Sequence, residues 1–321
     1  MKRILLLLLV GLFLNSAARS ESLRNSGGAV AYSVEGILTI KSASGRTLHV
    51  FKTTPPVGTF AISPDGQSIV FALLGPGPMH NGGQLYLLSI ATGKVHRLTH
   101  TPVYNKWEVY AYPDFSPSGD QVVFAIHSQL GAVPSDGDDA VMDAGPFAVL
   151  NLRSGVVKKL SSTENIDGNG PGYGTSPRWS PDGKKLFLNI EDDFFLTNSS
   201  GKPLQDISNW TQGSLFALDW LGNECIVSVG GNDWEAAEKE PAKVLLLDMH
   251  KTEPLAKLLG VAPAQVTGLI ALSPTIRVRK IGDKLIIETH NGTWSVVDPD
   301  HYPNVRILST WTEAQVPSVC R

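Results

Sequence analysis

Short apolar runs recur along the chain, and three of them follow the same four-residue signature. The signature is Ser-Pro-Asp-Gly at residues 63–66 and 180–183, and Ser-Pro-Ser-Gly at residues 116–119. The copies lie 53 and 64 residues apart, and each has an apolar or aromatic residue before its serine and an apolar run after its glycine. A unit of short strands and tight turns that recurs at such spacing is typical of a radial or solenoid array.

Each unit is predicted to hold four short strands. The first strand leads into the signature, the second follows it, the third comes after a variable connection and the fourth after a tight turn. In the units with a clear signature the predicted strands are residues 59–62, 68–72, 84–89 and 94–98; 112–115, 121–126, 147–152 and 156–160; and 179, 185–189, 193–197 and 203–207. Glycine suits the hairpin turns because one turn residue must take a positive φ.

Three further units have weaker signatures. The fifth carries residues 218–223 in place of the signature, and the sixth keeps only residues 272–274. The strands predicted after them are 225–229 and 244–248 in the fifth unit, and 285–289, 293–297 and 305–308 in the sixth. The N-terminal unit has strands at 29–33, 38–41 and 48–52 but lacks a first strand. We hypothesise that residues 315–319 supply it; a disordered tail is the alternative.

The sequence therefore predicts an all-β, six-bladed β-propeller with four-stranded antiparallel blades. Because the fifth and sixth units are weak, five or seven blades are the alternatives. Gly and Pro are abundant, with 31 and 21 residues, which agrees with a chain that has many turns.

The repeated pattern resembles the TolB-like, WD40-like propeller repeat. Residues 60–72, 115–125 and 179–188 carry the resemblance, whereas 218–229 and 272–287 match less well. The resemblance implies a propeller with a scaffold or binding role in the bacterial envelope. TolB itself has an α/β domain before its propeller, and only residues 19–28 precede the first predicted strand here, so the resemblance is to the propeller alone.

The first 18 residues have the layout of a secretory signal peptide. A basic start, Lys2 and Arg3, precedes an apolar stretch at residues 4–14 and small residues at 16–18. The apolar stretch is too short for a typical membrane-spanning helix, although an uncleaved anchor is the alternative. We expect a single propeller domain at residues 19–321 that is periplasmic or secreted, without stable membrane insertion.

Charge excludes one class of partner. The formal net charge is −3 and 18% of residues are charged, so the chain lacks the basic surface that nucleic acid requires. The two cysteines, Cys225 and Cys320, could pair in an exported protein or remain two thiols.

A binding surface is predicted on one side of the propeller. The long connections 74–83, 99–111, 127–145, 161–176 and 230–241 all join the same ends of strands, and we call this side the long-loop face. Aromatic side chains favour contact with a partner. The predicted contact residues are Tyr104, Trp107, Tyr110, His127, Tyr173 and Trp234. The alternative is that each aromatic covers the edge of its own blade.

Two groups of residues could hold a metal. Asp136, Asp138, Asp139 and Asp143 could offer oxygen ligands to calcium, the alternative being a solvated acidic loop. His80, His100, His127 and His290 belong to or flank the long-loop face and would form a transition-metal site if they converged. No other cofactor is expected.

The predicted function is non-catalytic binding of a protein, a peptide or an envelope component. Asp65 and Asp182 of the signature are predicted to hold turns rather than to act as catalytic acids. The chain has no Gly-x-Ser-x-Gly signature of a serine hydrolase. The alternatives are a metal-dependent hydrolase or lyase that acts on a carbohydrate or small substrate at the central channel, and an architectural subunit. The oligomeric state is not predicted.

Overall fold

The computed structural model describes fifteen stretches of the chain. They are residues 29–53, 57–73, 84–100, 108–129, 142–160, 177–190, 193–207, 214–222, 225–231, 241–248, 265–267, 269–272, 276–289, 292–297 and 304–308. These stretches contain strands and turns and no helix. Accordingly, no helix in them is long and apolar enough to cross a membrane.

The described strands form six four-stranded antiparallel sheets. Sheet 1 contains β1 (Ala29–Val34), β2 (Ile37–Ser42), β3 (Thr47–Lys52) and β24 (Asn304–Leu308). Sheet 2 contains β4 (Val57–Ile62), β5 (Ser68–Leu73), β6 (Leu85–Ser89) and β7 (Val95–Arg97). Sheet 3 contains β8 (Glu108–Phe115), β9 (Gln121–Gln129), β10 (Met142–Asn151) and β11 (Val157–Lys159).

The second half of the chain repeats this arrangement. Sheet 4 contains β12 (Arg178–Trp179), β13 (Lys185–Ile190), β14 (Asp193–Asn198) and β15 (Pro203–Asp206). Sheet 5 contains β16 (Ser214–Trp220), β17 (Cys225–Gly231), β18 (Pro241–Asp248) and β19 (Gln265–Thr267). Sheet 6 contains β20 (Leu269–Leu272), β21 (Ile276–Ile281), β22 (Lys284–Thr289) and β23 (Gly292–Val297).

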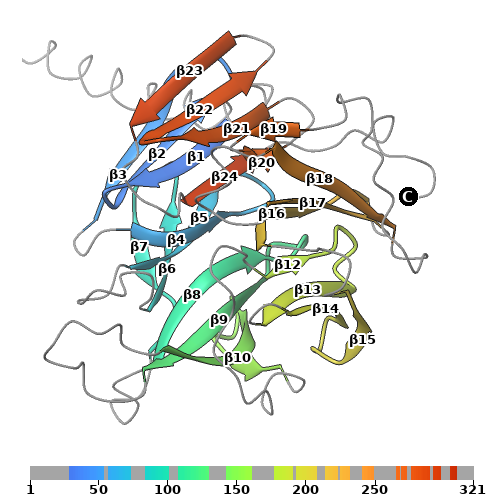
Figure 1. Cartoon of the computed structure of the whole chain (residues 1–321). Coiled ribbons are helices and arrows are strands. Elements are labelled where there is room, and N and C mark those ends of the chain that lie inside the picture. The colour runs from blue at the N-terminus through green and yellow to red at the C-terminus, as the bar shows by residue number, and fades with distance from the viewer. Residues whose placement is uncertain are drawn as a thin grey trace, which may run out of the picture.

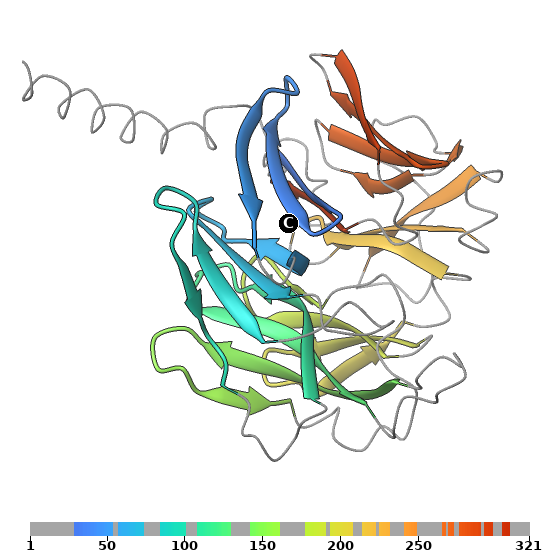
Figure 2. The same ribbon diagram turned by 90° about the vertical axis from the view of Figure 1, so that its left-hand side faces the viewer.

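One strand of each sheet contacts the corresponding strands of the two neighbouring sheets. In cyclic order these inner strands are β24, β4, β8, β12, β16 and β20, and β20 contacts β24 again. Figure 1 shows β24, β12 and β16 toward the middle of the molecule and β3, β15 and β23 at its periphery. Figure 2 shows the sheets following one another around the molecule in order of colour.

The two ends of the described chain meet in sheet 1. β24 pairs antiparallel with β1, so that Ala31 lies opposite Arg306. The missing strand of the first unit therefore comes from residues 304–308, and not from residues 315–319, which lie outside the described residues. The strands predicted for the sixth unit were wrong. Its second strand is β21, which was not predicted, and residues 305–308, predicted as its last strand, belong to sheet 1.

The apolar runs after the signatures are buried on both faces. In β5, Ile69 and Phe71 pack in a cluster shared with sheet 1, whereas Val70 and Ala72 pack in a cluster shared with sheet 3. Successive residues of a strand point to opposite faces, so a strand between two sheets must be apolar at every position. β9 repeats this pattern between sheets 2 and 4. Apolar clusters between neighbouring sheets thus hold sheets 1 to 4 together, and another joins sheet 6 to sheet 1.

The signature serine and aspartate close their turns as predicted. The Ser63 hydroxyl donates to Asp65 Oδ1 at 2.5 Å, and the same oxygen accepts the Gln67 N–H at 2.9 Å. Ser180 and Asp182 repeat the arrangement at 2.7 Å. The signature glycines take positive φ angles between 69° and 73°, a region that glycine enters without steric cost.

The middle signature has Ser118 in place of the aspartate, and a carboxylate, that of Asp120, follows two residues later. Asp120 Oδ1 accepts hydrogen bonds from the hydroxyls of Ser118 and Ser116. The Ser118 hydrogen bond is the main cause that lowers the pKa of Asp120. The turn therefore keeps its carboxylate although its sequence departs from the pattern.

Replacing Asp182 by asparagine is expected to lower stability more at neutral pH than in acid. Burial opposes ionisation of the Asp182 carboxyl, but hydrogen bonds from the Lys184 N–H and the Ser180 hydroxyl, with the Lys184 charge, outweigh it and lower its pKa. Such a group contributes stability above its unfolded-state pKa, about 3.9, and loses it as the pH falls through the folded-state pKa.

Because solvent screens the exposed Asp182, we expect the Asp182→Asn substitution to cost about 0.5 kcal/mol at neutral pH and close to nothing at about pH 2. Urea unfolding of both proteins at the two pH values measures this difference. An equal cost at both would show that the ionised carboxylate is not what stabilises the turn.

Candidate functional site

A polar cluster lies among the inner strands, where the sheets meet. Asp114 on β8 accepts a hydrogen bond at Oδ1 from Arg178 Nη1 at 3.1 Å, and this contact is also an ion pair. Its Oδ2 accepts the backbone N–H of Trp179 at 3.1 Å. Asp114 thereby ties sheet 3 to sheet 4 through both carboxylate oxygens.

The cluster is mostly buried. The side chains of Arg178 and Asp114 are 19% and 18% exposed. Burial raises the pKa of Asp114, although the Arg178 charge, the Trp179 N–H and the Arg306 charge all act to lower it. A carboxyl with a perturbed pKa among converging charges is a candidate functional group.

A bulge in β8 accompanies this site. The pairing of β8 with β9 shifts between Ala111 and Asp114, and Tyr112 within the shift has a φ of 52°. The Tyr112 N–H donates to Thr59 Oγ1 on β4 at 2.8 Å. A bulge changes the direction of the residues beside it. The hydrogen bond of Tyr112 within this bulge links sheet 3 to sheet 2 close to Asp114.

Strand register defines an equivalent position on all six inner strands. It is the residue that pairs with the third residue of the neighbouring strand in the same sheet, and we call it the inner-ring position. It is occupied by Ala61 on β4, Asp114 on β8, Arg178 on β12, Asp219 on β16, Ala271 on β20 and Arg306 on β24. Four of the six positions thus carry charged residues, although the strands around them are apolar.

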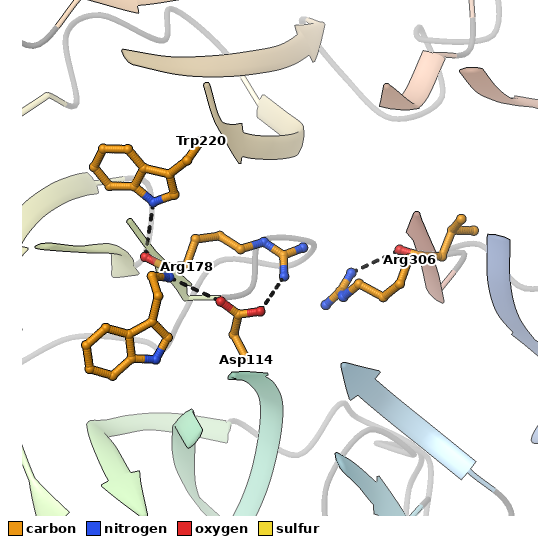
Figure 3. Close-up of polar contacts among 6 residues, drawn as sticks. Asp114, Arg178, Trp220 and Arg306 are labelled. Atoms are coloured by element: carbon orange, nitrogen blue, oxygen red, sulfur yellow. Dashed lines mark hydrogen bonds and ion pairs between the residues drawn. The ribbon is translucent and has the colours of Figure 1, made fainter. Parts of the chain in front are cut away.

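The two arginines approach the same region from different sheets. Figure 3 shows the side chains of Arg178 and Arg306 pointing toward one another, with Asp114 beside the Arg178 guanidinium. Arg306 Nη1 donates to the backbone carbonyl of Val305 at 3.0 Å. Trp220 Nε1 donates to the Arg178 carbonyl at 3.3 Å, which links sheet 5 to sheet 4. The cluster thus collects polar contacts from four sheets.

Sequence reasoning did not find this cluster. Asp114 and Arg178 each stand two residues before a signature serine, a place where the first copy has Ala61. A charged residue inside an otherwise apolar strand was the available signal. That Arg306 occupies the same position could not be inferred while its strand was assigned to the sixth unit.

Most of the predicted contact residues lie outside the described residues. These are Tyr104, Trp107, Tyr173 and Trp234. Tyr110 is described: it is 7% exposed and packs edge-on against Phe124 in the apolar cluster between sheets 2 and 3. This packing gives Tyr110 a structural role, and its contact with a partner stays a prediction. His127 lies on β9, where it pairs with Ala144.

The predicted metal ligands are only partly described. Asp143 lies on β10 opposite Ser128, whereas Asp136, Asp138 and Asp139 fall outside the described residues. His100 is exposed next to the end of β7, and His80 and His290 are not described. Within the described stretches no three His, Cys, Asp or Glu side chains form a group that could hold a metal ion. Cys320 is likewise not described, so its pairing with Cys225 stays a prediction.

Comparison with known proteins finds a relative for part of the chain. No model of a known protein family matches the chain. Over 126 residues the chain is 29% identical to the Tol-Pal system protein TolB of Francisella tularensis subsp. mediasiatica. Part of this chain is similar to TolB. The aligned part spans 39% of this chain and 24% of that relative.

Two solved structures are similar to the chain. Oligogalacturonate lyase in complex with manganese matches 87% of this chain and 84% of that chain, with a TM-score of 0.52 and 12% identity. A structure assigned to TolB from Agrobacterium tumefaciens matches 89% of this chain and 99% of that chain, with a TM-score of 0.45 and 12% identity. At this identity the likeness to the lyase concerns the fold alone. The described part of the chain is all-β and consists of four-stranded antiparallel sheets.

Proposed function

We propose that this chain is an exported, non-catalytic, six-bladed β-propeller that binds a protein, a peptide or an envelope component through its long-loop face. Three features support the proposal: the cyclic contacts of the inner strands, the placement of the long connections, and the use of Asp114 as a tie between sheets. The partial similarity to TolB and the signal-like residues 1–18 favour a periplasmic or secreted location.

The topology supports a rigid ring. Six described sheets contact one another through their inner strands in cyclic order, and β24 completes sheet 1 by pairing with β1. Strand exchange between the ends of a chain closes the ring without leaving an inner edge open. A closed ring fixes the loops at its rim, which makes it a suitable scaffold for binding.

The placement of the long connections is the observation that carries the proposal. Five of the six longest gaps between strands separate β5 from β6, β7 from β8, β9 from β10, β11 from β12, and β17 from β18. In antiparallel sheets entered through the inner strand, all of these connections begin at the same end of the sheets. The opposite end carries the short signature turns and one long connection, residues 249–264 between β18 and β19. The asymmetry favours the long-loop face as the place where a partner binds.

The central carboxylate supports a non-catalytic role. Both oxygens of Asp114 accept hydrogen bonds from the neighbouring sheet. A general acid or base has to reach the proton that it transfers, whereas Asp114 is engaged in holding two sheets together. We further propose that Asp136, Asp138, Asp139 and Asp143 form, at most, a structural calcium site.

Metal analysis separates this proposal from the metal-dependent hydrolase or lyase. We expect elemental analysis of the purified mature chain to find no stoichiometric manganese, zinc or iron. We also expect the melting temperature to stay the same when those ions are withheld. Bound calcium together with a lower melting temperature in EDTA would support the structural site. An Asp138→Asn/Asp139→Asn variant should then bind no calcium, and EDTA should leave its melting temperature unchanged. A stoichiometric transition metal would contradict the non-catalytic proposal.

A further inference from the structure

The hairpins that join the third and fourth strands of sheets 2, 3 and 4 carry an excess of positive charge. We call residues 91–97, 153–159 and 199–204 of these hairpins the hairpin rim. The three segments contain six lysine or arginine residues and no aspartate or glutamate, although the whole chain has a formal net charge of −3. The cations are Lys94, Arg97, Arg153, Lys158, Lys159 and Lys202. The charge of the whole chain therefore conceals a local basic surface.

Apolar side chains share this exposed surface with the cations. Every residue in 91–97 and 153–159 is exposed, and so are all but one of residues 199–204. The exposed apolar side chains of the rim are Val95, Val156, Val157 and Leu204. Among the other large apolar side chains that the structure describes, only Val50 and Ile281 are exposed to this degree. The hairpin rim thus combines positive charge with exposed aliphatic groups.

Backbone contacts hold the three hairpins in place beside the signature turns. In each sheet an N–H near the start of the hairpin donates, at 2.9 Å, to the carbonyl of the residue directly after the signature glycine. The pairs are Ile90 with Gln67, Leu152 with Asp120, and Ser199 with Lys184. The hairpin of sheet 4 also packs against sheet 3, because a Cβ atom at Gly201 would lie 2.6 Å from Leu160 Cβ. The rim is therefore a fixed surface at the end of the sheets opposite the long-loop face.

The composition of the rim favours a lipid surface over a protein partner. Protein interfaces are enriched in Tyr, Trp and Phe and depleted in Lys, whereas the rim has four lysines and none of these three aromatic residues. Anionic headgroups attract lysine and arginine through charge. Aliphatic side chains between them can enter the boundary of the acyl chains while the long basic side chains extend to the headgroups. A soluble polyanion would use the charges and leave the valines in water.

We propose that the hairpin rim binds reversibly to the surface of a membrane that contains anionic phospholipids. The cations attract the headgroups, and the exposed valine and leucine side chains enter the boundary of the acyl chains. Because the rim and the long connections lie at opposite ends of the sheets, this binding leaves the long-loop face accessible to a partner. It requires no segment of the chain to cross the membrane.

Vesicle flotation tests the proposal. The mature chain, residues 19–321, is used because the apolar residues 4–14 would themselves bind lipid. Vesicles of phosphatidylcholine are compared with vesicles that contain about one-third phosphatidylglycerol, at low salt and in about 1 M salt, which screens charges beyond about 3 Å. We expect flotation with the anionic vesicles at low salt only.

Two results of the flotation experiment would overturn the proposal. One is no binding to the anionic vesicles at low salt, and the other is equal binding to both kinds of vesicle. Soluble polyglutamate is added as a competitor. Binding of polyglutamate that is tighter than binding of the anionic vesicles would also overturn the proposal, and would indicate an acidic protein as the partner.

Matched charge variants locate the site. Arg153→Gln/Lys158→Gln should weaken binding to the anionic vesicles roughly tenfold or more, because each cation held near such a surface strengthens binding about fivefold. Lys52→Gln/Lys284→Gln removes the same charge from two exposed lysines of sheets 1 and 6, outside the rim. This control should bind within about twofold of the wild-type chain, because salt screens distant exposed charges. Equal losses in the two variants would contradict binding through the rim.

A tryptophan reporter tests the apolar part of the surface. Val156 is 60% exposed on the rim, and Val50 is 57% exposed on β3, outside the rim. The fluorescence added by Val156→Trp should shift to the blue with anionic vesicles, because the indole enters the membrane interface. The fluorescence added by Val50→Trp should not shift. A shift in Val50→Trp, or none in Val156→Trp, would contradict the proposal, and neither result would affect partner binding on the long-loop face.

Discussion

Replacing Asp114 by alanine is expected to lower the free energy of unfolding by about 3–5 kcal/mol. The substitution removes the acceptors of the Arg178 guanidinium and the Trp179 N–H, and leaves a largely buried positive charge without its ion-pair partner. The loss also breaks a tie between sheets 3 and 4. Urea unfolding of the purified variant, followed by tryptophan fluorescence, measures the change.

A second ion pair provides the control. Arg279 and Glu288 are joined at 2.6 Å on neighbouring strands of sheet 6, with side chains 23% and 29% exposed. Glu288→Ala should cost about 1 kcal/mol, because that pair is more exposed and lies within one sheet. Equal losses for Asp114→Ala and Glu288→Ala would show that the inner-strand cluster has no special structural role.

Removing β24 is expected to abolish cooperative folding. A chain that ends at residue 303 leaves sheet 1 with three strands and exposes the inner edge of β1, whose residues 29–31 are fully buried. It also removes Arg306 and the buried Val305. Because unpaired backbone groups and exposed apolar surface are both costly, we expect no cooperative thermal transition and a tendency to aggregate.

A second truncated chain, which keeps β24, isolates the contribution of this strand. A chain that ends at residue 310 keeps β24 and should melt close to the full chain, as judged by calorimetry. If both truncated chains lose their transition, residues after 310 are essential and β24 alone does not close the ring. If both retain it, the pairing of β24 with β1 contributes little to stability.

Much of the fold could be predicted because its signals are local. The signature turns need only a few residues, and the hydrogen bonds of Ser63 and Asp65 follow directly from that local sequence. The apolar runs around Val70 and Val123 signal strands that are covered on both faces. These signals repeat, so each copy strengthens the assignment of the others.

The closing strand could not be assigned from local signals. Residues 305–308 form a short apolar strand that fits the sixth unit as well as the first, and only the pairing with β1, more than 270 residues earlier in the sequence, separates the two assignments. The sequence between β20 and β21 also lacks the Asp-Gly half of the signature, so β21 was not predicted. The error followed from a choice between long-range partners that sequence alone does not reveal.

The inner-strand cluster was missed for a related reason. Asp114, Arg178 and Arg306 are separated by 64 and 128 residues, and their proximity depends on the register of three sheets. A charged residue before the signature can be read as the solvated side of an edge strand. Only the cyclic arrangement turns these positions into a common centre.

Site-specific photo-crosslinking tests the central claim most directly. A benzophenone amino acid is placed at Trp107, Tyr173 or Trp234 on the long-loop face, and at Val95, Val157 or Leu204 as exposed controls on the outer strands β7, β11 and β15. The protein is irradiated in intact cells and adducts are resolved by mass spectrometry. We predict a discrete protein adduct from at least one long-loop position and none from the controls. Adducts confined to the outer strands, or none from any position, would contradict a binding role for the long-loop face.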